Sequence, residues 1–255
     1  MTIVTSLAKV TLLEAVRNRL FWLVGAIVVV AFGLAQFLAQ VAITESREIQ
    51  VSLLAAFLRA AVVFVVMTFV ITSTVREFND KVTDLLLSLP MPRASYLLGK
   101  FAGYALFGAV LAPLAALPLV LYAHAGGLAA WTLSLFCELL IVTAVSLFCV
   151  LSLAQVVPAF ATVAGFYLLS RSMAAMQLIA GAGLQEPTTT DRIVSAVVNS
   201  IALVLPALDR MTQTAWLVAG APLDAVSLAG ILAQTAIYVV FIVAAALFDL
   251  YRRNF

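Results

Sequence analysis

The sequence predicts an all-α membrane protein with six transmembrane helices, on the strength of three observations. Of its 255 residues, 65% are hydrophobic and the mean hydropathy is +1.16, whereas soluble domains are roughly 45 to 50% apolar. Apolar runs of about 20 residues recur along the chain, and each is long enough to cross a hydrocarbon core of roughly 30 Å as a helix. The runs are apolar on all sides, whereas strands of a membrane barrel alternate apolar and polar residues.

These apolar runs define the predicted spans, which together form one transmembrane domain. They lie at residues 20–42, 52–75, 97–122, 131–154, 159–182 and 227–249. In the third span, Gly99 and Gly103 have the spacing of small residues that allow close helix packing. Pro113 and Pro118 predict a bend in the same span.

Residues 1–19, before the first span, predict an amphipathic helix lying in the cytoplasmic interface. Its apolar face consists of Ile3, Leu7, Val10, Leu13 and Val16. Arg17 and Arg19 would reach lipid headgroups, and they serve equally as topology anchors. The apolar run that follows is about 23 residues long, whereas a signal-peptide core has roughly 7 to 15, so we expect no cleavage.

A seventh apolar stretch, residues 193–208, is too short to span with confidence and is interrupted by polar residues and Pro206. Its apolar residues line one face at helical spacing: Ile193, Val197, Ile201, Val204 and Leu208. We therefore expect an amphipathic helix at the outer interface or a re-entrant segment, within an outer-face amphipathic segment over 185–226.

The distribution of Lys and Arg predicts the orientation. Six spans place nine basic residues on one side: Lys9, Arg17, Arg19, Arg76, Lys81, Arg93, Lys100, Arg252 and Arg253. Only Arg47, Arg192 and Arg210 fall on the other side. By the positive-inside rule we expect a multi-pass protein with both termini in the cytoplasm.

The sequence carries no recognisable catalytic, metal or nucleic-acid motif. The Gly99-Lys100 pair lacks the preceding glycine of a phosphate-binding loop, and His124 is the only histidine. Cys137 and Cys149 lie twelve residues apart on one predicted helix, roughly 18 Å, so they cannot form a disulfide with each other. No clustered basic and aromatic face suggests nucleic acid. We expect no enzyme activity, metal or cofactor in this chain.

The most charged segment is "REFNDKVTDLLLSLPMPRASYLLGK", residues 76–100, between the second and third spans. Residues 76–90 predict a short amphipathic helix on the cytoplasmic membrane surface. Its apolar face is Phe78, Val82, Leu85, Leu86 and Leu89, and its polar face is Glu77, Asp80, Lys81 and Asp84. Such a helix is either simply solvated or a docking surface for a partner.

This segment resembles the coupling-helix region of type-2 ABC exporter permeases. The resemblance lies in an acidic helix, a Leu-Leu-x-Ser-x-Pro turn, an Arg, and Tyr-Leu-Leu-Gly-Lys at the start of a span. The layout is similar along essentially the whole chain: an interfacial first helix, six spans, amphipathic helices between the fifth and sixth, and a basic tail.

The resemblance implies a permease of a bacterial plasma (inner) membrane that works as a homodimer, with a separate ATPase subunit under each coupling helix. ATP and Mg would bind to that partner. The residues implied at the ATPase interface are Glu77, Asp80, Lys81, Asp84, Leu85, Leu86 and Arg93. Substrate, direction and any periplasmic partner stay open. The alternatives from other classes are a non-transporting scaffold subunit, which would need no polar path, and an intramembrane enzyme, which would need a catalytic pair in the bilayer.

Three ionisable residues lie well inside predicted spans: Arg59, Glu138 and Arg171. All lie in the outer half of the bilayer at similar depth, roughly 10 to 17 Å from the outer ends of their spans. We expect Glu138 and Arg171 to form an ion pair, which would leave Arg59 over. An unpaired arginine facing a polar cavity favours a lipid-like or anionic substrate, because its planar fork matches phosphate and carboxylate.

Overall fold

A computed structural model of the chain describes residues 3–17, 20–41, 46–81, 92–181, 189–218 and 225–252. Within these ranges every regular element is helical, and none is a strand. The predicted all-α class is therefore confirmed.

Six long helices overlap the six predicted spans. They are α2 (Leu20–Val41), α3 (Ser46–Asn79), α5 (Arg93–Ala116), α6 (Ala125–Leu153), α7 (Val156–Gly181) and α10 (Ala225–Arg252). Within the described residues, all but α2 are long and apolar enough to cross a membrane, and α2 contributes a shorter apolar stretch, Trp22–Phe37. A pair of helical pieces after α7 adds a further candidate span if it counts as one broken helix.

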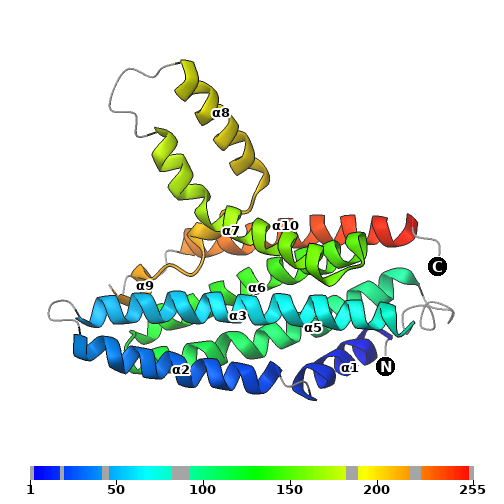
Figure 1. The fold of residues 1–255 in the computed structure, drawn as a ribbon, viewed down its shortest axis with the longest axis horizontal. Helices are drawn as coiled ribbons and strands as arrows, with labels where there is room; N and C mark the ends of the chain where they lie inside the picture. Colours follow the sequence, from blue (N-terminus) through cyan, green and yellow to red (C-terminus); the bar gives the residue numbers. More distant parts are fainter. Residues whose placement is uncertain are drawn as a thin grey trace.

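The bundle is organised around α6, which contacts α3, α5, α7 and α10 (Figure 1). Helix α6 is the most enclosed of the candidate spans, because 78% of its apolar 18-residue stretch is buried. The side chains of Trp131, Leu135 and Leu139 lie fully inside the bundle. By contrast, only 22% of the corresponding stretch in α7 and 17% of that in α10 are buried. The apolar outer faces of α7 and α10 are therefore left for lipid or another protein.

The first helix, α1 (Ile3–Arg17), packs along α5. A Cβ on Gly99 would lie 2.8 Å from Leu7 Cβ, and one on Gly103 would lie 2.6 Å from Thr11 Cβ. Both distances are shorter than real carbon contacts, so only glycine permits this approach of the helices. The packing role expected of Gly99 and Gly103 is confirmed.

After α5 the chain continues as a short 3-10 helix, η1 (Leu117–Leu121), which has Pro118 in its first turn. A proline is tolerated there because the first backbone N–H groups of a helix have no partner within it. Pro158 occupies the first turn of α7 for the same reason, so α7 begins at Val156, three residues before the predicted span.

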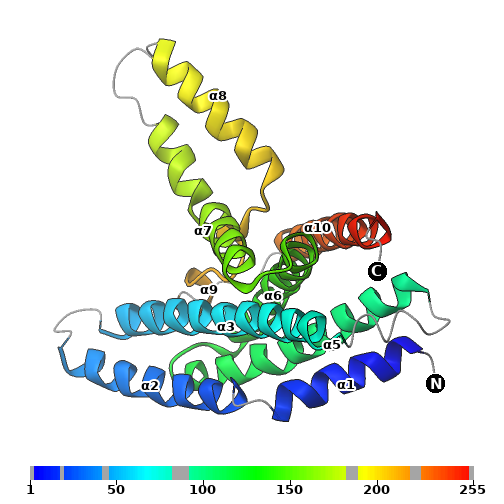
Figure 2. The same cartoon turned by 45° about the vertical axis from the view of Figure 1, so that its right-hand side comes forward.

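Helices α7 and α8 (Thr189–Val204) lie side by side as a hairpin that projects from the bundle (Figure 2). Several apolar side chains of α8 are exposed, including Ile193, Val197 and Leu203. Between α8 and the stretch Leu208–Val218 the chain bends by 68°, a geometry that fits a broken span or a re-entrant segment.

The stretch after α8 contains the short helices η2 (Leu208–Arg210) and α9 (Ala215–Val218). It turns into the bundle, where Met211, Thr212 and Leu217 are buried. At Gly127 on α6, a Cβ would collide with the backbone carbonyl of Trp216, so α9 rests directly on the α6 backbone. Residues 208–218, part of the predicted outer-face segment 185–226, therefore pack into the bundle, which fits the re-entrant alternative; residues 182–188 and 219–224 lie outside the described residues.

The end of α3 also differs from the prediction. Residues 76–79 form the last turn of α3 and do not start a separate surface helix; the helix ends where Lys81 takes a left-handed conformation, with φ of 55°. No glycine or proline precedes this point to break the helix earlier. The remainder of the predicted coupling helix, residues 82–90, falls outside the described residues. Both described ends of the chain lie at the same end of the bundle (Figure 1).

Candidate functional site

Glu138 lies at the centre of the molecule, on the most buried helix. Its side chain is fully enclosed, with 0% exposure. One carboxylate oxygen, Oε1, accepts a hydrogen bond of 2.8 Å from the Tyr167 hydroxyl of α7. The other, Oε2, accepts one of 2.9 Å from the Thr212 hydroxyl. Each oxygen of this buried carboxylate therefore has a donor.

Thr212 joins the charged side chains of three helices. Besides donating to Glu138, its hydroxyl accepts from Nη1 of Arg171 at 3.2 Å and from Nη1 of Arg59 at 3.5 Å. A hydroxyl has one proton and two lone pairs, so its capacity is fully used. The backbone N–H of Thr212 donates to Ser134 Oγ of α6 at 3.0 Å.

The backbone of Thr212 is itself unusual, with φ of 48°. A positive φ is rare and strained for a β-branched residue. The strain persists because three helices and a backbone hydrogen bond fix this residue in place. Strained residues of this kind concentrate at functional sites.

Arg171 is held mainly by backbone carbonyls. Its Nη1 donates to the carbonyl of Leu208 and, at 3.0 Å, to that of Met211. These carbonyls belong to the turn that carries Thr212, so Arg171 fixes the turn against α7. The guanidinium is well suited to this because it presents several donors in one plane.

The expected ion pair between Glu138 and Arg171 is wrong in its geometry. Within the described residues neither Arg171 nor Arg59 comes within 4.0 Å of a carboxylate oxygen, and the connection to Glu138 runs through the Thr212 hydroxyl. The reason is the inward turn of residues 208–212, which places a hydroxyl and two carbonyls between the charges. Arg59, Glu138 and Arg171 nevertheless lie at one level of the bundle, since all three gather at Thr212.

An open cavity of about 520 Å³ adjoins this cluster. Its walls come from α3, α7 and the stretch 209–215. The charged residues on the walls are Arg59, Arg171 and Asp209; the uncharged polar ones are Ser52, Thr212, Gln213 and Thr214. Its volume is in the range of small-ligand sites, which is roughly 300 to 1,000 Å³.

The chain matches no known protein-family model and no curated protein.

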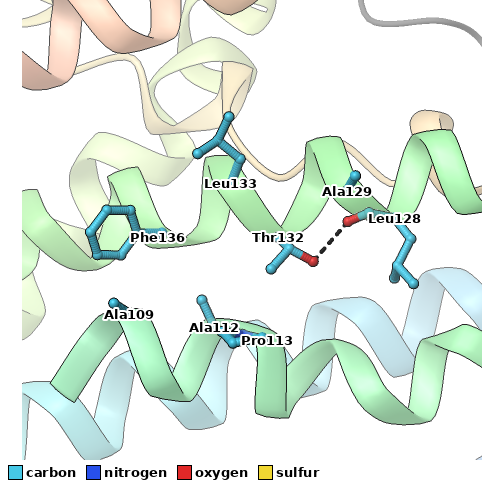
Figure 3. Close-up of a pocket in the computed structure, with 8 residues that line it drawn as sticks. All are labelled: Ala109, Ala112, Pro113, Leu128, Ala129, Thr132, Leu133 and Phe136. Atoms are coloured by element: carbon cyan, nitrogen blue, oxygen red, sulfur yellow. Dashed lines mark hydrogen bonds between the residues drawn. The ribbon is translucent and has the colours of Figure 1, made fainter. Parts of the chain in front are cut away.

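A second cavity, also about 520 Å³, lies between α5 and α6 and is almost wholly apolar. Figure 3 shows its lining, with Pro113 on one side and Phe136 on the other. The hydroxyl of Thr132 is occupied, because it donates to the carbonyl of Leu128 in its own helix at 2.8 Å. This second cavity therefore has few polar groups that could recognise a ligand.

The residues predicted at the ATPase interface fall into three groups. Asp80 and Lys81 are exposed; Asp80 forms a solvated ion pair with Arg76 at 3.6 Å. Glu77 is turned inward and forms an ion pair with Lys100, and it accepts a hydrogen bond from Tyr96 at 3.2 Å. Asp84, Leu85 and Leu86 lie outside the described residues.

Arg93, the remaining residue predicted at the ATPase interface, and Lys100 both bind groups of the helical bundle itself. Lys100 is 4% exposed, because its ammonium pairs with Glu77 at the end of α3. Arg93 donates from Nη1 to the carbonyl of Leu250 at 2.9 Å and more weakly to that of Tyr251. These are carbonyls of the last turn of α10, which a cation stabilises.

A further polar network ties α1 to this region. Ser73 donates to Glu14 at 2.9 Å and accepts from the Tyr104 hydroxyl at 3.2 Å, and Thr74 lies 3.1 Å from that same hydroxyl. The α1, α3 and α5 ends are therefore joined by buried polar contacts as well as by packing.

Within the described ranges, no three His, Cys, Asp or Glu side chains gather closely enough to hold a metal ion. The functional residues that sequence reasoning missed are Thr212, Tyr167 and Asp209. The only sequence signal was a polar stretch, "DRMTQT" (209–214), directly after an apolar run.

Proposed function

We propose that this chain is the transmembrane permease subunit of an ATP-driven exporter of the type-2 ABC class, moving a lipid-like or anionic substrate. ATP and Mg are bound by a separate ATPase subunit, and the permease works as a homodimer in a bacterial inner membrane. Both termini face the cytoplasm.

The observation that carries the proposal is the polar cavity beside Arg59 and Thr212 within an apolar helical bundle. Charged side chains at membrane depth are costly and typically mark substrate or ion pathways. A scaffold subunit has no need for such a cavity, which favours transport over the alternative of a non-transporting anchor. An intramembrane enzyme would need a reactive pair in the bilayer, whereas the hydrogen bonds of Glu138 to Tyr167 and Thr212 tie helices together and favour a structural role for this carboxylate.

The exposed pair Asp80 and Lys81 supports a cytoplasmic partner at the loop that follows α3. Because Glu77 is engaged with Lys100, we assign it to anchoring the loop, and we assign partner contact to Asp80, Lys81 and the residues up to Leu86. The sparsely buried faces of α7 and α10 leave room for lipids and a second copy of the chain.

The proposal is tested by purifying the chain from its native membrane and identifying bound proteins by mass spectrometry. We expect an ATP-binding cassette subunit to copurify and its ATP hydrolysis to drive movement of a lipid-like or anionic compound in proteoliposomes. Reversing Asp80 and Asp84 to Lys should release the ATPase or uncouple it, while the permease still inserts. A chain that copurifies with other membrane proteins but no ATPase would support the scaffold instead.

A further inference from the structure

Not every charged side chain around the Thr212 cavity has an oppositely charged partner in direct contact within the described residues. Glu138 and Arg171 both bond to the Thr212 hydroxyl, so these two opposite charges are linked through one bridging group. Arg59 and Asp209 are the remaining charges, and both line the cavity. Within the described residues, no ion pair joins these two to each other or to any other side chain.

Arg59 has unused hydrogen-bonding capacity. Its single hydrogen bond, from Nη1 to Thr212, is at the 3.5 Å limit, and its Nε is buried without a partner in the described part of the chain. A guanidinium has five N–H donors, and an unsatisfied buried donor is costly. An acceptor group from a ligand in the cavity would remove this cost.

Asp209 adds a negative charge to the cavity wall, and this charge interacts electrostatically with Arg171. Within the described residues, no hydrogen bond or ion pair is found for its carboxylate. A purely anionic ligand bound at Arg59 would be repelled by Asp209, whereas a ligand that also carries an ammonium group would contact both. Arg59 and Asp209 line one cavity, and within the described residues no ion pair joins them, so a ligand that carries both a phosphate and an ammonium matches the lining better than a simple anion.

The surroundings favour a lipid over a water-soluble zwitterion. The cavity lies against α3, a candidate membrane span, and its lining includes the apolar residues Leu53 and Ala56. Acyl chains of a lipid could continue along this apolar surface while the headgroup enters the cavity.

We propose that the cavity binds the zwitterionic headgroup of a phospholipid with a primary amine, its phosphate on Arg59 and its ammonium on Asp209. The planar fork of Arg59 suits a phosphate, and the ammonium restores the charge balance at Asp209. Arg171 and Glu138 are positioning residues that hold the turn of Thr212. The inference rests on the proposed function for its place in a transport path, but binding is measured without transport.

The test is native mass spectrometry of the full chain in detergent, titrated with phosphatidylethanolamine, phosphatidylglycerol or phosphatidylcholine of identical acyl chains. Phosphatidylethanolamine should bind about tenfold more tightly than phosphatidylglycerol, which lacks the amine. Phosphatidylcholine should bind more weakly than phosphatidylethanolamine, because its quaternary nitrogen cannot donate a hydrogen bond to Asp209. Equal binding of the three lipids would overturn the proposal.

Two variants separate the charges. Arg59→Gln should weaken binding of all three lipids about tenfold, because each carries a phosphate. Asp209→Asn should abolish the preference for phosphatidylethanolamine while leaving phosphatidylglycerol bound as well or better. The matched control is Arg210→Gln, an exposed neighbour that does not line the cavity, and it should leave the lipid profile unchanged. If Arg59→Gln does not fold, the Asp209→Asn profile alone decides, and an unchanged preference there overturns the proposal.

Free phosphoethanolamine distinguishes a lipid from a soluble ligand with the same charges. We expect millimolar phosphoethanolamine not to displace the bound lipid; displacement at the lipid's own concentration would overturn the lipid assignment. If only the proposed function is wrong, the lipid selectivity would persist although no ATPase subunit copurifies. Conversely, ATP-driven transport without headgroup selectivity would defeat only this inference.

Discussion

The hydroxyl of Thr212 lies 2.9 Å from the carboxylate of Glu138 and, within the described residues, is the single group hydrogen-bonded both to this buried acid and to the arginines of α3 and α7. One hydroxyl thus replaces the direct ion pair that the sequence suggested. The stability of the site should depend on this small side chain more than on any charged pair.

Replacing Thr212 by Val keeps the shape of the side chain and removes the hydroxyl. We expect a loss of about 1 to 3 kcal/mol in the free energy of unfolding, because an oxygen of buried Glu138 loses its donor. Thr212→Ser retains the hydroxyl and should cost clearly less. Thermal unfolding of the purified protein in detergent measures both, and equal losses for Val and Ser would contradict the role of the hydroxyl.

Glu138 and Arg171 should still couple through that bridge. Glu138→Gln alone leaves Arg171 without its nearest negative charge, whereas the double change to Gln removes both charges. In a double-mutant cycle we expect a coupling of about 0.5 to 3 kcal/mol, at the lower end because the contact is indirect. Strict additivity of the two single variants would show that the residues act independently.

The buried pair of Glu77 and Lys100 contrasts with the exposed pair of Arg76 and Asp80 on the same turn of α3. Lys100→Met strands a buried carboxylate and should cost about 3 to 5 kcal/mol, whereas Lys100→Met with Glu77→Leu should recover most of the loss. Arg76→Gln should cost less than about 1 kcal/mol, since the side chains of Arg76 and Asp80 are 79% and 58% exposed. Chemical denaturation distinguishes them, and similar losses in the two pairs would contradict the assigned burial.

The approach of α1 to α5 depends on glycine. Gly103→Val should push Thr11 away and cost about 1 to 3 kcal/mol, and it should make α1 more accessible to protease. Gly25→Val on α2 is the matched control, because a Cβ there meets no atom within 4 Å. If both valine variants melt alike, the packing of α1 on α5 is not the cause.

Topology can be tested by labelling single cysteines after the buried Cys137 and Cys149 are changed to Ala. An impermeant reagent outside the cell should reach a cysteine at Gln185 or Thr188 but not one at Asn79 or Asn254. The reason is that six spans with the basic loops inside place both termini in the cytoplasm. External labelling at Asn254 would require an odd number of spans and would make residues 193–208 a full crossing.

The long helices were predictable from sequence because an apolar run of about 20 residues has few other stable forms in a membrane. The ends of helices at polar residues were less predictable from the sequence. The sequence around Glu77 predicts the start of a surface helix, whereas in the structure α3 continues through Glu77, which contacts Lys100 23 residues further on.

The charged residues of the candidate site were predictable from the sequence, but Thr212, the residue that joins them, was not. Arg59, Glu138 and Arg171 stand out because ionisable residues are rare within apolar runs. Thr212 does not stand out, because threonine is common in polar loops and its role comes from a turn with positive φ that packs on α6. Local sequence carries no signal for such a tertiary arrangement.

The contact between Glu77 and Lys100 also closes the chain into a ring whose two ends are 23 residues apart in sequence. Closing a loop in this way removes conformational entropy before anything binds to it. A partner that docks on residues within the ring therefore meets a smaller ordering cost than it would on a free segment. Removing the contact between Glu77 and Lys100, as in Lys100→Met, should slow association of the partner even where every side chain that contacts the partner is intact.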